Sequence, residues 1–287
     1  MTDVLDEAWL RANPLPPMEA ATDKDSRGRV LLAGGCREVP GGILLAAEAA
    51  LRAGAGKLQV ATAAAVAPGL ALRLPEARVV ALPETAEGGI GPAAAPRLEE
   101  LAARVDAVGF GPGMMDPEEA GALARALLRG VRRPVAFLLD AAAICGLEPD
   151  SIGRHGGRLV LTPHAGEMAQ MLGIRRAEVE EDPLDAGRRA ARRFQAVVVV
   201  KGQHSQVVTP QGAALMVEGG GVGLATSGSG DVLAGAITGL LARGAPPLVA
   251  AGWGVWLHAQ AGRALGPPGF LARELPGQFP ALLAAAG

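Results

Sequence analysis

Residues 224–244 read LATSGSGDVLAGAITGLLARG and hold the most informative pattern in the chain. Small residues from Ala225 to Gly230 precede residues 231–243, where apolar side chains recur at helical spacing and predict a helix. Successive small residues let backbone amides turn toward one point, and a helix start adds unpaired N–H donors and the positive end of the dipole. The segment therefore predicts an anion-binding hole suited to a phosphoryl group.

Asp231 lies at the start of this predicted helix, where its carboxylate can reach a hydroxyl on a substrate. Because a helix start stabilises negative charge, we expect the ionised form, which can act as a general base. The alternative interpretation is that Ser229 or Asp231 merely caps the helix after a flexible loop, and the spacing alone favours neither. The helix should have one apolar face, formed by Val232, Leu233, Ala236, Ile237, Leu240 and Leu241.

The preceding part of the chain alternates between short apolar runs and longer segments rich in Ala, Leu, Glu and Arg. The runs are continuous, as expected for strands covered on both faces, and lie at residues 29–33, 57–62, 78–82, 107–110, 135–140, 158–161 and 196–201. Predicted helices between them lie at residues 42–53, 92–104, 117–129 and 183–195. This alternation predicts an α/β fold, with a mostly parallel central sheet flanked by helices on both faces, in a single domain spanning residues 1–287.

The pattern changes after Lys201. Residues 205–209 and 213–218, separated by a Pro-Gln-Gly turn, predict a β-hairpin. A glycine-rich segment at residues 219–230 leads into the helix that begins at Asp231, and a second helix is predicted at residues 248–265.

Side chains in the last predicted helix read as structural. Trp253 and Trp256 indicate core packing, and His258 lies in a nearly all-apolar helix, which favours a buried structural histidine over a metal ligand. His155 and His204 are predicted to be loop residues at the surface.

The composition excludes several classes of protein. The formal net charge is −2 without a basic block, so nucleic acid is not an expected partner. The two cysteines, Cys36 and Cys145, form no CxxC pair, which argues against a disulfide framework or zinc site. Residues 1–9 are acidic, unlike a signal peptide, and the longest uncharged apolar run, residues 246–257, is too short to cross a bilayer. We therefore expect a soluble cytoplasmic protein.

Three common motifs are absent from the sequence. It contains no GxxxxGK[ST] phosphate loop, no GxSxG nucleophile elbow and no HExxH metal pair. Residues 109–113, GFGPG, follow a predicted strand, but Pro112 departs from the dinucleotide-binding GxGxxG pattern. The anion hole before Asp231 thus remains the strongest chemical signal.

Two strand-ending loops are further candidates, because open α/β sheets bind ligands at the carboxyl ends of their strands. In residues 161–167, LTPHAGE, His164 and Glu167 could contact a ligand; taken alone, the loop favours a plain Thr162 turn with Glu167 at a helix start. In residues 197–205, VVVVKGQHS, the amides of a Lys-Gly turn could hold a nucleotide phosphate beside Lys201. An ordinary tight turn is the alternative.

Together these segments resemble the ADP/ATP-dependent NAD(P)H-hydrate dehydratase family, which has a ribokinase-like fold. The matching stretches occur in the family's order and cover most of residues 29–265. TPHxGE, GSGD and LHxxAG in combination are quite specific, whereas GSGD alone indicates only the ribokinase-like superfamily. The stretches are VLLAGG, VPGGILLAAEAALRAGAGKLQVAT, FGPGM, LLDAAAI, LTPHAGEMAQMLG, VVVVKG, LATSGSGDVLAGAITGLLARG and WGVWLHAQAG.

The resemblance implies a repair reaction. Its substrate would be the 6-hydrate of NADH or NADPH, a damaged form with a hydroxyl on C6 of the nicotinamide ring. ADP or ATP would phosphorylate this hydroxyl, and elimination of phosphate would restore the dihydropyridine. Such chemistry needs a base, an anion hole and a cation, here Mg²⁺, that screens the phosphate charge.

The resemblance also implies roles for particular residues. Asp231 would be the catalytic base. The hydrate would bind at Gly42, Gly111, His164 and Asp231. The nucleotide would bind at Lys201, Gly202, Gln203, His204, Ser205, Gly228, Ser229 and Gly230. No protein ligand for the metal follows from it.

Two departures from the family pattern stand out. The usual HKGxxG-like stretch near the N-terminus reads DKDSRG at residues 23–28, which keeps only Lys24 and Gly28. The Lys-Gly turn ends in Ser205 where Thr is usual, so the hydroxyl is retained. Only 28 residues precede the first predicted strand, so we expect no N-terminal epimerase domain of the kind that many members carry. The resemblance also implies a homo-oligomer, such as a tetramer.

Two other functions fit part of the same pattern. A small-molecule kinase of the ribokinase-like superfamily, acting on a sugar, hydroxymethylpyrimidine or hydroxyethylthiazole, would use the same Asp231 but release a stable phosphate ester. A nucleotide-binding regulatory module would not turn over, and the intact Gly230-Asp231 pair argues against it. The TPHxGE segment favours the dehydratase.

Overall fold

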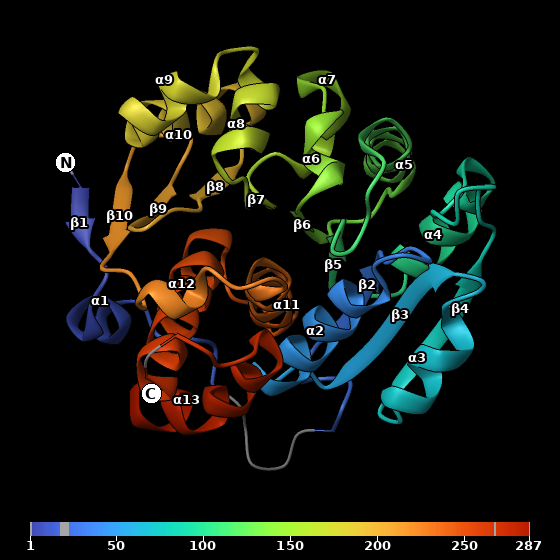
Figure 1. Ribbon diagram of the computed structural model, residues 1–287, viewed down its shortest axis with the longest axis horizontal. Helices are drawn as coiled ribbons and strands as arrows, with labels where there is room; N and C mark the ends of the chain where they lie inside the picture. The colour runs from blue at the N-terminus through green and yellow to red at the C-terminus, as the bar shows by residue number, and fades with distance from the viewer. Residues whose placement is uncertain (1, 18–22, 267, 287) are drawn as a thin grey trace.

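The computed structural model describes residues 2–17, 23–266 and 268–286. Their centre is a ten-stranded sheet with the strand order β1-β10-β9-β8-β7-β6-β5-β2-β3-β4 (Figure 1). The seven strands β2 to β8, which are neighbours in the sheet, run parallel to one another, as the continuous apolar runs predicted. They are β1 (Thr2–Val4), β2 (Arg29–Ala33), β3 (Lys57–Ala63), β4 (Ala77–Leu82), β5 (Ala107–Phe110), β6 (Ala136–Leu139), β7 (Leu159–Leu161), β8 (Val197–Val200), β9 (Ser205–Val208) and β10 (Ala214–Val217).

Helices cover both faces of the sheet (Figure 1), which confirms the predicted layering. One face carries α1 (Glu7–Ala12), α2 (Pro40–Arg52), α3 (Ala67–Arg73), α11 (Ser229–Ala242), α12 (Pro247–Leu265) and α13 (Phe279–Ala286). The other carries α4 (Ala95–Ala102), α5 (Pro117–Gly130), α6 (Ala142–Cys145), α7 (Pro149–Ile152), α8 (Ala165–Leu172), α9 (Arg176–Glu181) and α10 (Pro183–Phe194). Within β2, Val30 and Leu32 face the first layer, whereas Leu31 and Ala33 face the second. Period-two alternation thus places apolar side chains in both cores.

The central helix α11 is more buried than its sequence predicted. All of its residues from Val232 to Ala242 are buried, not only one apolar face. The reason lies in its glycines: a Cβ on Gly235 would lie 2.1 Å from the carbonyl oxygen of Ala46 in α2. Without side chains at these positions the two helix backbones can approach closely, and α2 covers the side of α11 that would otherwise face water.

The predicted hairpin is present, since β9 and β10 pair antiparallel. The short edge strand β1 was not predicted; it pairs parallel with β10, and its three residues are all exposed, so they carry no alternating pattern. The prediction that His155 lies at the surface was wrong. Its side chain is fully buried edge-on against Phe137, with Nε2 3.1 Å from the carbonyl oxygen of Val131.

Other predictions made from composition hold for the residues that the structure describes. Cys36 and Cys145 are both free, and Trp253 and Trp256 are buried. In the described part of the chain, no helix combines the length and the apolar character that crossing a membrane would need.

The strand order reverses direction between β5 and β2, so the loops after these strands diverge at the carboxyl edge of the sheet. Such a reversal is where open α/β sheets bind their ligands. Helix α11 packs over β5, β6 and β2, and its N-terminus opens at this edge.

Candidate active site

A cavity of about 830 Å³ lies at this edge of the sheet, within the size range of small-molecule sites. It brings together three segments that are far apart in sequence: the Lys-Gly turn after β8, the glycine-rich segment after β10 and the first turn of α11. Of the predicted nucleotide residues, the cavity is lined by Lys201, Gly202, Gln203, His204, Ser205, Ser229 and Gly230. His164 and His258 also line it.

The first turn of α11 has free backbone donors. Its N-cap residue is Gly228, which has a φ of 87° and provides no side-chain hydrogen bond to the helix. The interpretation that Ser229 or Asp231 is the cap is therefore wrong, because both lie inside the helix. The Ser229 amide donates to the Thr226 carbonyl oxygen at 3.2 Å, whereas the amides that follow it in this turn have no intrahelical acceptor and remain available to an anion in the cavity.

Asp231 lies beside the cavity, against a wall made of glycine. A Cβ on Gly42 would lie 2.8 Å from the Cα of Gly113 and 3.1 Å from Oδ1 of Asp231. Gly42, at the start of α2, therefore lets the loop after β5 and the carboxylate come close together. The sequence grouped Gly42 with Asp231, and the structure brings these two residues together.

The pKa of Asp231 is shifted upward, opposite to the effect expected of a helix start, although the expected ionised form holds at neutral pH. Burial and the nearby carboxylate of Asp140 raise its pKa from 3.8 to about 6, while the Lys201 charge and a hydrogen bond with the Gly113 backbone act in the opposite sense. The helix dipole that we expected to favour the ionised form does not overcome burial beside like charges. A carboxylate with this pKa is still mostly ionised at neutral pH, and a pKa near the working pH suits a general base.

Gly111 supports the site through its backbone. It has a φ of 121°, and a Cβ at this position would lie 1.9 Å from the carbonyl oxygen of Asp140. Any side chain here would separate the loops that follow β5 and β6. Gly111 thus holds Asp140 in place, and it does not line the main cavity.

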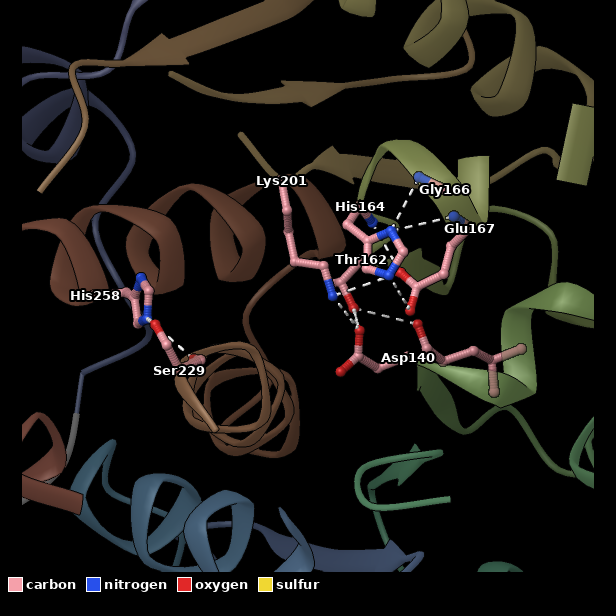
Figure 2. A network of polar contacts seen from close by, with 9 residues as sticks. Asp140, Thr162, His164, Gly166, Glu167, Lys201, Ser229 and His258 are labelled. Atoms are coloured by element: carbon pink, nitrogen blue, oxygen red, sulfur yellow. Dashed lines mark hydrogen bonds and ion pairs between the residues drawn. The ribbon is translucent and has the colours of Figure 1, made fainter. Parts of the chain in front are cut away.

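Four polar side chains from three strand ends form a network around Lys201 (Figure 2). The Lys201 ammonium lies 2.8 Å from Oδ1 of Asp140 and 3.7 Å from Oε2 of Glu167. Thr162 donates a hydrogen bond of 2.7 Å to the same Asp140 oxygen. Burial alone would lower the pKa of Lys201, but the Asp140 and Glu167 carboxylates raise it above its usual value. The lysine therefore stays cationic, and its Nζ would lie 3.6 Å from a Cβ on Gly230.

Asp140 is the functional candidate that the sequence analysis missed. It is 2% exposed and follows β6 directly. Its available signal was a carboxylate at the end of the apolar run of β6, the same signal that drew attention to the loop after β7. A buried carboxylate without a partner is costly, so its contact with Lys201 accounts for its position.

His164 has a structural role that the sequence did not predict. Its Nδ1 accepts hydrogen bonds from the amides of Gly166 and Glu167, at 3.0 and 3.2 Å, and Glu167 accepts from the His164 amide at 2.8 Å. This capping box starts α8, so the predicted Thr162 turn is replaced by a His164 cap (Figure 2). Because Nδ1 accepts, Nε2 carries the hydrogen. The His164 side chain is 59% exposed and lines the cavity, so it can both cap α8 and contact a ligand.

The divergent segment at residues 23–28 lies away from Asp231. A Cβ on Gly28 would lie 2.2 Å from the carbonyl oxygen of Ala242, the last residue of α11. Since Asp231 is in the first turn of this 14-residue helix, the two ends are separated by roughly 20 Å. The departure from the family pattern at this segment therefore leaves the carboxylate site itself unchanged.

Fold and site together define a ribokinase-like α/β protein, in which a glycine-rich helix start with an adjoining carboxylate faces a nucleotide-sized cavity. The family model described as NAD(P)H-hydrate dehydratase matches residues 30–268, and the chain belongs to this family.

Individual relatives agree with this assignment. The chain is 49% identical to an ADP-dependent (S)-NAD(P)H-hydrate dehydratase of Xanthomonas campestris pv. campestris, over 96% of this chain and 94% of that protein. It is 41% identical to a bifunctional NAD(P)H-hydrate repair enzyme of Moorella thermoacetica, over 90% of this chain but only 49% of that longer protein. A crystal structure of ADP/ATP-dependent NAD(P)H-hydrate dehydratase from Bacillus subtilis, co-crystallised with ATP/Mg²⁺, superposes with a TM-score of 0.86 at 27% identity. That match covers 100% of this chain and 99% of the other.

Proposed function

We propose that this protein repairs hydrated nicotinamide nucleotides, using ADP as the phosphoryl donor to convert (6S)-NADH hydrate or (6S)-NADPH hydrate back to NADH or NADPH. Membership of the family supports the reaction, and the name of the Xanthomonas relative supports ADP. The observation that carries the proposal is the position of Asp231. Its carboxylate has a pKa near 6, follows Gly230 of the cavity wall and adjoins Gly42 on its other side.

Asp231 removes a proton in this scheme. As the C6 oxygen of the hydrate attacks the terminal phosphorus of the nucleotide, the carboxylate accepts the hydroxyl proton, and the bond from that phosphorus to its bridging oxygen breaks. AMP leaves when ADP is the donor. The lone pair of the ring nitrogen then expels phosphate from C6, and loss of a proton from C5 restores the dihydropyridine.

The surrounding residues hold the transferred group. The amides of the first turn of α11 and the Lys201 ammonium provide donors and positive charge on the cavity side of Asp231. Fixed donors of this kind stabilise the charge on a transferring phosphoryl group without having to reorganise. Asp140 and Thr162 keep Lys201 in place.

The donor set fits Mg²⁺. In the described residues, no three His, Cys, Asp or Glu side chains come close enough together to hold a metal unaided. Asp140 and Glu167 nevertheless both approach Lys201, which leaves carboxylate charge in excess beside the cavity. Mg²⁺ commonly binds through one or two carboxylates together with phosphate oxygens, so these two residues would hold it. When bound, it supplies positive charge that screens the nucleotide phosphates.

A product analysis tests the function. The protein is incubated with NADH hydrate, Mg²⁺ and either ADP or ATP, while the near-ultraviolet absorbance of the dihydropyridine ring is followed. We expect the absorbance to recover together with equimolar orthophosphate and AMP, and faster with ADP than with ATP. A stable phosphate ester without recovery of absorbance would instead identify a small-molecule kinase.

We further infer a homo-oligomeric state, which rests on the family resemblance, and a cytoplasmic location, which rests on the sequence composition. Light scattering of the purified protein and fractionation of the producing cells test them separately.

A further inference from the structure

A half-buried histidine contacts the first turn of α11, in the wall of the same cavity that Lys201 lines. Nε2 of His258, in α12, lies 2.8 Å from Oγ of Ser229 and 3.0 Å from the Ser229 carbonyl oxygen (Figure 2). Both residues line the cavity, and Ser229 is only 5% exposed. The sequence assigned His258 a purely structural role, but its contact joins it to the proposed phosphate site.

The two short contacts define which ring nitrogen carries the hydrogen. A backbone carbonyl oxygen can only accept a hydrogen bond, so Nε2 must be the donor at 3.0 Å. The Ser229 hydroxyl oxygen faces the same Nε2–H group, so it can only accept a hydrogen bond from it. Its own hydrogen is left free, in a residue that lines the cavity.

The surroundings keep the ring neutral. Burial, together with the Lys201 charge, lowers the pKa of His258 to about 4 even though the Ser229 backbone contact acts in the opposite sense. A neutral imidazole has a single N–H, and this N–H is used by Ser229. The geometry also excludes a serine nucleophile activated by a histidine base, since that would require an unprotonated Nε2 facing Oγ.

We propose that His258 is a positioning residue, which fixes the Ser229 hydroxyl so that it donates a hydrogen bond to a phosphate oxygen of the nucleotide in the cavity. This inference rests on the proposed nucleotide site and adds a side-chain donor to the amides of the α11 start. His258 acts through Ser229 and does not itself contact the phosphate.

A double-mutant cycle on nucleotide affinity tests the inference without using the hydrate. The affinity for ADP with Mg²⁺ is measured by calorimetry for wild type, Ser229→Ala, His258→Leu and the double variant. We expect each single variant to bind ADP roughly 10- to 100-fold more weakly, the usual effect of one hydrogen bond to a charged group. In the Ser229→Ala background, His258→Leu should weaken ADP binding further by less than about threefold, because the hydroxyl that His258 orients is already absent.

The matched control is His258→Gln, whose side-chain amide can donate at a similar reach, and we expect it to retain most of the affinity. Equal losses from His258→Leu in both backgrounds would mean that the histidine only supports the helix, and would overturn the inference. So would unchanged ADP affinity in Ser229→Ala. Absence of ADP and ATP binding in wild type would instead remove the proposed function itself.

A measurement on the unmodified protein covers the case in which His258→Leu does not fold. The chain has four histidines, so a proton–nitrogen NMR spectrum of the imidazoles can be assigned with His258→Gln. We expect His258 to be the neutral Nε2–H form. A hydrogen on Nδ1 would contradict the proposed role.

Discussion

Asp231 is the residue on which the proposed chemistry depends, and an isosteric amide isolates its role. Asp231→Asn keeps the shape of the side chain but cannot accept the hydroxyl proton. We expect nucleotide affinity to be unchanged or slightly higher, and turnover to fall by roughly 10²–10⁴-fold, the usual effect of losing a general base. In wild type, turnover should rise with pH through about 6, where the carboxylate ionises. Wild-type turnover in the Asn variant would remove Asp231 as the base.

The same variant should be more stable than wild type at alkaline pH. Between the unfolded pKa of 3.8 and the folded pKa of about 6, the native state binds more protons than the unfolded state, so stability falls as pH rises through this window. Above it, ionised Asp231 costs roughly 1–3 kcal/mol, which Asn removes. We expect a higher melting temperature for Asp231→Asn at about pH 8 and no difference below about pH 4. Equal melting temperatures at both pH values would contradict the raised pKa.

His164 offers two variants that separate its two contacts. His164→Ala removes both the cap of α8 and the Nε2–H donor, so we expect a loss of about 1 kcal/mol in stability and a roughly tenfold rise in the KM for the hydrate. His164→Asn keeps a good N-cap and should lose only the second contact. Steady-state kinetics and denaturant melts measure both effects. Normal hydrate KM in the Asn variant would show that His164 serves only as a cap, and a change in the nucleotide constant alone would assign it to the other ligand.

The position of the phosphate-site residues could be predicted from local pattern, but their protonation could not. Small residues before a helix identify the α11 start, and the Lys-Gly turn identifies Lys201, because both signals are contiguous in sequence. The raised pKa of Asp231 depends on burial and on the carboxylates of Asp140 and Glu167, which segments distant in sequence bring near it. Gly202, in the Lys-Gly turn, has no positive φ, and a Cβ there would meet only the His204 carbonyl oxygen, at 3.7 Å.

At the scale of elements, the contact between α11 and α2 fixes where Asp231 sits. Gly235→Ala would place a Cβ 2.1 Å from the Ala46 carbonyl oxygen, so the helices must separate. We expect a loss of roughly 1–3 kcal/mol in the free energy of unfolding, as for other overpacked cores, together with lower turnover. The matched control is Gly69→Ala in α3, where a Cβ meets nothing within 4 Å. This substitution should raise the free energy of unfolding by roughly 0.5–1 kcal/mol. Equal stabilisation by both substitutions in urea melts would contradict the close packing.

Element boundaries followed from periodicity wherever the pattern was long. The seven predicted strands and the other predicted helices agree with the structure to within two residues, whereas the helix predicted at residues 92–104 is a 3-10 turn at Pro92–Ala94 followed by the shorter α4. The edge strand β1 escaped prediction because it is three residues long and exposed. The full burial of α11 could not be predicted, because the glycines on its second side carry no apolar signal in the sequence. Only the packing of the partner helix shows that this side is also covered.

At the scale of the whole molecule, the parallel sheet with two helical layers could be predicted, whereas the strand order could not. Continuous apolar runs show that strands are covered on both faces, but they do not say which strands are neighbours. The reversal between β5 and β2 is a long-range property. This reversal brings the loops after β2 and β5 together beside Asp231, whereas the main cavity is lined by the segments after β8 and β10.

The fate of the hydroxyl oxygen shows whether the hydroxyl of the hydrate is phosphorylated before it leaves. NADH hydrate carrying heavy oxygen in its C6 hydroxyl is turned over with ADP and Mg²⁺, and the products are examined by mass spectrometry. If the hydroxyl is phosphorylated before elimination, the C6–O bond breaks while oxygen is attached to phosphorus, and the label appears in orthophosphate. Label released as water would contradict phosphoryl transfer to the hydrate and, with it, the role of Asp231 as the base.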